Sequence, residues 1–152
     1  MGKSFDMVNV ICLKWGDRYP SYYVNRLYNG VKKNLDRDFR FICVTDDPKG
    51  LLSIIEIQDF PENPGVRRGW PDVLVKLLLF KDGFASLSGP TLFLDLDVLI
   101  TCRIDKFFEY KPGKNCIIRN WTSGIRRITG HKKFVGNSSV FRFNAGDTHY
   151  AY

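Results

Sequence analysis

The sequence predicts an α/β fold with a mostly parallel central sheet and helices on both faces. Short apolar runs without polar alternation, at residues 8–13 and 91–94, are typical of parallel strands that are buried on both sides. Segments 20–35 and 71–84 carry apolar residues at helical spacing. Repeated alternation of strand and helix along the chain is the pattern of such a sheet.

The first third of the chain is expected to form a strand, a helix and a second strand. The apolar run VNVICL at 8–13 ends in a turn at 14–17, and the amphipathic segment 20–35 begins with Pro20, which a first helical turn accepts. Residues 39–45 (FRFICVT) form the second strand, which stops at the turn formers of 46–50. This order is the opening of a nucleotide-binding α/β unit.

The remaining elements are shorter. We expect a third strand at 52–57, a loop rich in Pro, Gly and Arg at 60–69 that is a candidate lid, and a helix at 71–84. The most apolar strand, 91–94, leads into a helical turn at 104–108, and two further strands follow at 116–119 and 139–143.

Length and composition are those of one globular domain covering residues 1–152. The hydrophobic fraction is 44% and the aromatic fraction 14%, which suits a packed core rather than a disordered chain. The formal charge of +7 favours an anionic partner such as a diphosphate, a nucleic acid or a membrane surface. Because the basic residues stand in short groups, a solvated basic surface explains the charge as well as any one of these partners does.

Four widely spaced cysteines without a CxxC pair indicate buried, reduced thiols; they are Cys12, Cys43, Cys102 and Cys116. No apolar run approaches the roughly 20 residues of a membrane span, and the polar N-terminus does not have the pattern of a signal peptide. The default expectation is a cytoplasmic location without a transmembrane segment, which leaves peripheral membrane contact open.

The sharpest motif is LFLDLDVLI, in which Asp95 and Asp97 interrupt an apolar run at positions i and i+2. In a strand both side chains would leave the same face, with Leu96 on the other. Two ionised carboxylates that close repel each other, so either one takes up a proton or a cation neutralises both. Mg²⁺ or Mn²⁺ is the natural partner, because these ions bind through one or two carboxylates plus phosphate oxygens. The alternative is an exposed strand of alternating polarity.

Several segments in order resemble the nucleotide-diphospho-sugar transferases of the GT-A fold, in particular the glycogenin-like and bacterial polysaccharide-type enzymes. They are VICLKWGDRYPSYYVNRLYNGVKKNL, FRFICVTDDPKGL, GWPDVLVKLLLF, GPTLFLDLDVLITCRIDKFF and GNSSVFRFNAG, which span nearly the whole chain. The resemblance implies a metal-dependent glycosyltransferase that uses Mn²⁺ or Mg²⁺ and moves a sugar from a nucleoside-diphosphate-sugar, a uridine one by preference, to a saccharide or other hydroxyl acceptor.

The resemblance also assigns roles to residues. It implies that Asp95 and Asp97 hold the metal, with Asp95 near the ribose, and that Asp46 or Asp47 reaches the base, although a plain turn explains these two equally well. The loop after the first strand would lie along the nucleotide; its residues are Leu13, Lys14, Trp15 and Gly16.

Lys76 matches the family's basic residue that contacts the diphosphate or the donor sugar, and the alternative is a lysine that reaches solvent. Small polar residues before the last strand would meet the sugar or acceptor, or else form a turn; they are Asn137, Ser138 and Ser139. Asn120 departs from the family, which often has an acidic residue there, while Trp121 offers a stacking face.

Arg67 and Arg68 are candidates to close over the pyrophosphate, and the alternative is solvation. His131 and His149 lack the spacing of a zinc site, and His149 is the nearby candidate for a third metal ligand. No catalytic residue is identified. The chain has no P-loop, GxGxxG turn or nucleophile elbow, which argues against kinases, dehydrogenases and α/β-hydrolases.

Two alternatives remain open. The chain ends at Tyr152, soon after the last strand, so a partial transferase domain that lacks an acceptor-side segment and binds donor without efficient turnover is a contender. A basic nucleic-acid-binding domain rests on charge and on Trp15, Tyr22 and Tyr23, and it predicts salt-sensitive oligonucleotide binding that survives chelation. We expect a nucleotide-sugar and no nucleic acid as partner.

Overall fold

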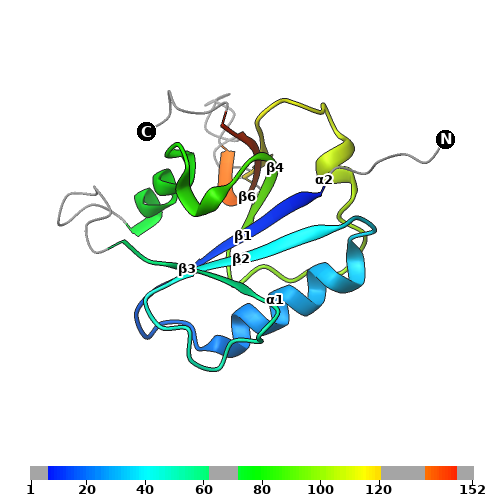
Figure 1. Ribbon diagram of the computed structural model, residues 1–152. Helices are drawn as coiled ribbons and strands as arrows, with labels where there is room; N and C mark the ends of the chain where they lie inside the picture. Colours follow the sequence, from blue (N-terminus) through cyan, green and yellow to red (C-terminus); the bar gives the residue numbers. More distant parts are fainter. Residues whose placement is uncertain (1–6, 62–71, 121–135, 147–152) are drawn as a thin grey trace, which may run out of the picture.

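One six-stranded sheet organises the computed structural model, which describes residues 7–61, 72–120 and 136–146 (Figure 1). The strand order is β3-β2-β1-β4-β6-β5. The strands are β1 (Val8–Lys14), β2 (Phe39–Thr45), β3 (Glu56–Asp59), β4 (Gly89–Leu94), β5 (Cys116–Arg119) and β6 (Gly136–Ala145). β3, β2, β1 and β4 run parallel, whereas β6 is antiparallel to β4 and β5 is antiparallel to β6. The predicted mostly parallel α/β sheet is confirmed.

Strand β1 lies at the centre and is buried along its whole length. Its neighbours are β2, which pairs in register from Val8 opposite Phe39, and β4, which pairs from Asn9 opposite Thr91. A strand with neighbours on both edges and layers on both faces needs apolar side chains in both directions, which explains the mostly apolar run VNVICL. Its polar member, Asn9, is buried and donates to the carbonyl of Ser88 at 2.8 Å.

Helices cover both faces of the sheet, as predicted. Helix α1 (Ser21–Asn34) packs its buried residues against the β1 face that carries Val10 and Cys12. The opposite face, with Ile11 and Leu13, packs against the 3-10 helix η1 (Asp72–Phe80). In Figure 1 α1 lies below the sheet and the green η1 above it. Adjacent β1 residues therefore supply two separate cores, because side chains alternate along a strand.

The segment predicted to be helical at 71–84 is helical but not continuous, since the 3-10 helix η1 spans Asp72–Phe80 and a short second turn, η2 (Phe84–Ser86), follows it. The amide of Lys81 donates to the carbonyl of Leu78, and Gly83 has a left-handed φ of 73°, which breaks the helix. Over so short a segment, apolar spacing does not distinguish i→i+3 from i→i+4 hydrogen bonding.

The third strand lies later than predicted. Residues 48–55 form successive turns, in which Leu51 donates to the carbonyl of Pro48 and Ile55 to that of Leu52, so pairing with β2 begins only at Glu56. Other boundaries shift less. The helical turn predicted at 104–108 is α2 (Lys106–Glu109), and β6 extends beyond the predicted 139–143 at both ends.

Arg142 fixes the segment before β5 against β6. It is 4% exposed, and its guanidinium donates at 2.5–2.7 Å to carbonyl oxygens of the chain at 107–114. These acceptors are the carbonyls of Phe107, Tyr110, Lys111 and Lys114. Carbonyl dipoles thus solvate a buried cation and hold β6, the strand that carries Ser138 and Ser139, in place.

The cysteines divide into two kinds. Cys12 and Cys43 are buried opposite each other on β1 and β2, as expected of core thiols. A hydrogen bond with Cys43 together with burial raises the pKa of the Cys12 thiol well above its usual value. Cys102 is exposed and Cys116 is half-buried, so the expectation of burial is wrong for Cys102. No helix in the described ranges is long and apolar enough to cross a membrane.

This division predicts a labelling order. Iodoacetamide should modify Cys102 in the native protein, whereas Cys12 and Cys43 should react only after unfolding in urea, because alkylation requires an accessible thiolate. Peptide mass spectrometry after short labelling measures the rate at each site. Native-state modification of Cys12 at the rate of Cys102 would contradict the buried core placed between β1 and α1.

Candidate functional site

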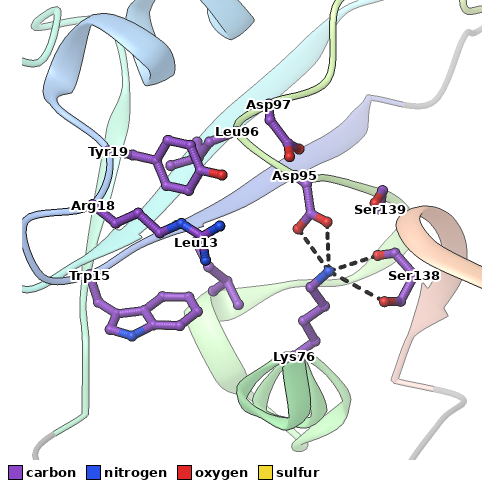
Figure 2. A pocket seen from close by; sticks show the side chains of 10 residues that line it. All are labelled: Leu13, Trp15, Arg18, Tyr19, Lys76, Asp95, Leu96, Asp97, Ser138 and Ser139. Carbon is purple, nitrogen blue, oxygen red and sulfur yellow. Dashed lines mark hydrogen bonds and ion pairs between the residues drawn. The ribbon is translucent and has the colours of Figure 1, made fainter. Parts of the chain in front are cut away.

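A cavity of about 390 Å³ opens at the carboxyl ends of the central strands β1 and β4. Its lining residues are Leu13, Trp15, Arg18, Tyr19, Lys76, Asp95, Leu96, Asp97, Ser138 and Ser139 (Figure 2). Ligands of open α/β sheets bind outside the carboxyl ends of parallel strands. The volume lies within the range of about 300–1,000 Å³ that is usual for ligand pockets.

Two unlike walls face each other across this cavity. In Figure 2 the aromatic and basic side chains of Trp15, Arg18 and Tyr19 lie on one side, and the carboxylates of Asp95 and Asp97 lie on the other. Lys76 rises from η1 toward Asp95. The arrangement offers ring faces, a guanidinium and carboxylates to one ligand.

The DLD motif, residues Asp95, Leu96 and Asp97, forms a turn. The expectation that it continues the strand is therefore wrong. β4 ends at Leu94, and the amide of Val98 donates to the carbonyl of Asp95 at 3.1 Å. Leu96 was expected on the face opposite the carboxylates; instead it is buried and also lines the cavity. Both carboxylates therefore reach the cavity because the chain turns there. Alternation of side chains along a strand had been the expected reason.

Lys76 and Asp95 form an ion pair inside the cavity. The ammonium lies 2.8 Å from Oδ1 and 2.8 Å from Oδ2 of Asp95, and the two side chains are 13% and 27% exposed. The same ammonium donates to the carbonyl of Ser138 at 3.0 Å and lies 4.9 Å from the ring centre of Phe93. Partial burial makes this pair stronger than an exposed one, because water screens it less.

Asp97 is the second carboxylate and is exposed to the cavity. The structure describes no hydrogen bond or ion pair from Asp97 to residues 7–61, 72–120 or 136–146. In those ranges no group of three or more His, Cys, Asp and Glu side chains is arranged to hold a metal. Asp95 and Asp97 suit a hard cation whose remaining ligands come from phosphate and water, which is the usual pattern for Mg²⁺.

Two of the four residues predicted to form the loop after the first strand, Leu13 and Lys14, belong to the end of β1, and only Trp15 and Gly16 follow it. Leu13 and Trp15 line the cavity, whereas Lys14 is buried and donates to the carbonyl of Asp47 at 3.1 Å. The amide of Gly16, at a φ of 62°, donates to Asp46 Oδ2 at 2.9 Å. Lys14 and Gly16 therefore position the loop rather than line the cavity.

The two acidic residues after β2 are engaged by backbone amides. Asp46 accepts from Gly16, and Asp47 Oδ1 accepts from the amide of Lys49 at 3.0 Å. Neither lines the cavity. These contacts are those of a structured turn, the alternative weighed above, and contact of either carboxylate with a base stays a prediction.

The three small polar residues predicted to precede the last strand lie within β6 instead, because that strand begins at Gly136. Ser138 and Ser139 line the cavity and Asn137 does not. Asn137 Oδ1 accepts from the amide of Ser139 at 2.9 Å, and the carbonyl of Ser139 accepts from the amide of Asp95 at 2.9 Å. Asn137 thus shapes the strand end beside the DLD turn.

Sequence reasoning missed Arg18 and Tyr19, which line the cavity together with the predicted loop residues. Their place in the connection between the first strand and the first helix was the available signal. It also missed Arg26, whose guanidinium lies 4.8 Å from the ring centre of Tyr23 and whose Nη2 lies 3.4 Å from the carbonyl of Leu96. Tyr22 and Tyr23, considered above as nucleic-acid stacking residues, contact each other and Arg26.

Some predicted residues lie outside the described ranges; they are Arg67, Arg68, Trp121, His131 and His149. Asn120 is described and does not line the cavity.

Comparison with solved structures identifies the fold. The chain is similar to an active-site mutant of LgtC, with a TM-score of 0.67 and 17% identity over 93% of this chain and 59% of that one. It is also similar to galactosyltransferase LgtC in complex with donor and acceptor sugar analogs, with a TM-score of 0.63 and 13% identity over the same shares. A scan of protein-family models finds no match, and a search of curated proteins finds none. The chain thus has the GT-A fold and spans about three-fifths of the LgtC chain.

The contact between Asp46 and Gly16 can be tested directly. In Asp46→Ala the Gly16 amide loses its acceptor, so its hydrogen exchange should become roughly 2- to 10-fold faster, which corresponds to about 0.5–1.5 kcal/mol for one hydrogen bond. Two-dimensional NMR measures exchange at single amides. Asp47→Ala is the matched control, in which Gly16 should keep its protection. Equal Gly16 exchange in Asp46→Ala and the wild type would show that this contact does not hold the loop.

Proposed function

We propose that this domain binds a nucleoside-diphosphate-sugar together with Mn²⁺ or Mg²⁺ and transfers the sugar to a hydroxyl acceptor, with uridine as the expected base. One observation carries the proposal: Asp95, Asp97 and Lys76 meet in a cavity at the carboxyl ends of β1 and β4. The GT-A fold that the chain shares with LgtC supports it.

In this proposal Asp95 and Asp97 hold the cation. When bound, the cation acts as a Lewis acid that offsets the negative charge growing on the departing diphosphate. Lys76 donates to a diphosphate oxygen and supplies a second positive charge at the same place. Both charges favour the transition state over the ground state, because the leaving group becomes more negative as the glycosidic bond breaks.

The other lining residues suit the rest of the donor. Trp15 and Tyr19 offer ring faces to the base or sugar, and Arg18 offers a guanidinium to phosphate. The hydroxyls of Ser138 and Ser139 suit hydrogen bonds with sugar hydroxyls. These residues bind and orient the donor in the proposal, and none of them is assigned as a base.

A thermal-shift panel tests donor binding. Nucleoside diphosphates and nucleotide-sugars are added with Mn²⁺ or with EDTA, and the uridine compounds with Mn²⁺ should stabilise most. A ligand at 100 times its Kd adds about 2.7 kcal/mol to the free energy of unfolding, or roughly 5–10 °C for a domain of this size. Oligonucleotide binding that survives EDTA, without any nucleotide shift, would support the nucleic-acid alternative instead.

The variant Asp97→Ala should abolish metal-dependent diphosphate binding and leave the fold intact. The change removes a cation ligand, while Asp97 has no described contact to lose and its charge repels that of Asp95. We expect no Mn²⁺-dependent shift with uridine diphosphate and a ligand-free Tm equal to or above that of the wild type.

Asp82→Ala is the matched control, since Asp82 is exposed and does not line the cavity. It should keep the wild-type response to Mn²⁺. If Asp97→Ala binds uridine diphosphate with unchanged metal dependence, the carboxylates are not the metal site.

A further inference from the structure

The cavity already contains a positive charge from the protein itself, the ammonium group of Lys76. The Lys76 ammonium contacts both oxygens of Asp95 at 2.8 Å, while Asp97 has no partner in the described part of the chain. One carboxylate of the pair is therefore neutralised by the protein and the other is not.

A divalent cation at these carboxylates must compete with that ammonium. Asp95 has two oxygens, and Lys76 contacts both. A metal ion on Asp95 would also stand close to a like charge, which is unfavourable at such short range in a partly buried place. Metal binding at Asp95 is thus opposed by the ammonium and becomes more favourable when Lys76 withdraws.

The free-energy cost of moving the Lys76 ammonium away from Asp95 depends on whether an anion is bound in the cavity. Its side chain is 13% exposed, and without Asp95 its remaining neighbours are the oxygens of Ser138 and the ring of Phe93. A largely buried ammonium without a counter-charge is strongly unfavourable. A diphosphate in the cavity supplies that counter-charge, because a flexible lysine can follow an anion as a point charge.

We propose that Lys76 couples the two ligands of the site: it occupies Asp95 in the ligand-free protein, opposes metal binding alone, and moves to the diphosphate when metal and diphosphate bind together. This inference rests on the proposed function, since it concerns the same cavity. The consequence is a domain that binds Mn²⁺ weakly by itself and tightly with a nucleoside diphosphate. By linkage, the metal must strengthen diphosphate binding by the same factor.

The test compares Lys76→Met, which keeps the stem and removes the charge, with Lys106→Met, an equal loss of charge on α2 outside the cavity. Titration of free Mn²⁺ by electron paramagnetic resonance gives the Kd without and with saturating uridine diphosphate, and uridine serves as the phosphate-free probe. Without nucleotide, Mn²⁺ should bind about 10-fold tighter to Lys76→Met than to the wild type, within the usual range of coupling between two sites. The tightening by uridine diphosphate should shrink by a similar factor.

In the absence of metal, Lys76→Met should also bind uridine diphosphate less tightly and uridine equally well. Lys106→Met should behave like the wild type throughout. Lys76→Gln is a second neutral variant that can still bond to Ser138, and circular dichroism checks that each variant folds.

Unchanged Mn²⁺ affinity in folded Lys76→Met and Lys76→Gln, with wild-type coupling to uridine diphosphate, would overturn the inference and leave the proposed function standing. Wild-type protein that binds no Mn²⁺ even with uridine diphosphate would overturn both.

Discussion

The ion pair between Lys76 and Asp95 joins the three parts of the fold that build the cavity. Lys76 belongs to η1 on one face of the sheet, Asp95 follows β4, and Ser138, the other partner of the ammonium, lies on β6. Charge attraction within a partly buried place therefore helps to hold the helix, the DLD turn and the antiparallel strand together. The same contact leaves Asp97 as the carboxylate without a described partner, which makes the site asymmetric before any ligand arrives.

This polar contact depends on apolar layers beneath it. β1 supplies Ile11 and Leu13 to the core that packs against η1. Its other face supplies Val10 and Cys12 to the core that packs against α1, so side chains pack against both faces of the strand. Leu96, which lies between Asp95 and Asp97 in the sequence, is buried and anchors the DLD turn. Arg26 of α1 also contacts this turn, at the carbonyl oxygen of Leu96. Close packing of the core and the hydrogen bond of the turn hold the two carboxylates at the carboxyl ends of the strands, although neither residue belongs to a strand.

Periodicity and turn chemistry were sufficient to predict the α/β class and the bounds of β2 and β5, because these strands are set by local apolar runs. The DLD motif was found because two carboxylates interrupt an apolar run, and Lys76 was found because its context resembles that of the basic residue in GT-A transferases. Their partners could not be predicted, since the Lys76 contact joins residues 19 and 62 positions apart. Arg18, Tyr19 and the carbonyl-bound Arg142 likewise depend on tertiary contacts that no local pattern specifies.

We propose that the cavity at Asp95 and Asp97 exchanges the Lys76 ammonium for a metal ion and a diphosphate. A crystal structure of the protein grown with Mn²⁺ and uridine diphosphate, with anomalous scattering to locate the manganese, would test this exchange. We expect manganese within bonding distance of both carboxylates and of the diphosphate, with the Lys76 ammonium on a phosphate oxygen instead of Asp95. Diphosphate bound elsewhere, or manganese away from both carboxylates with the Lys76 pair intact, would contradict it.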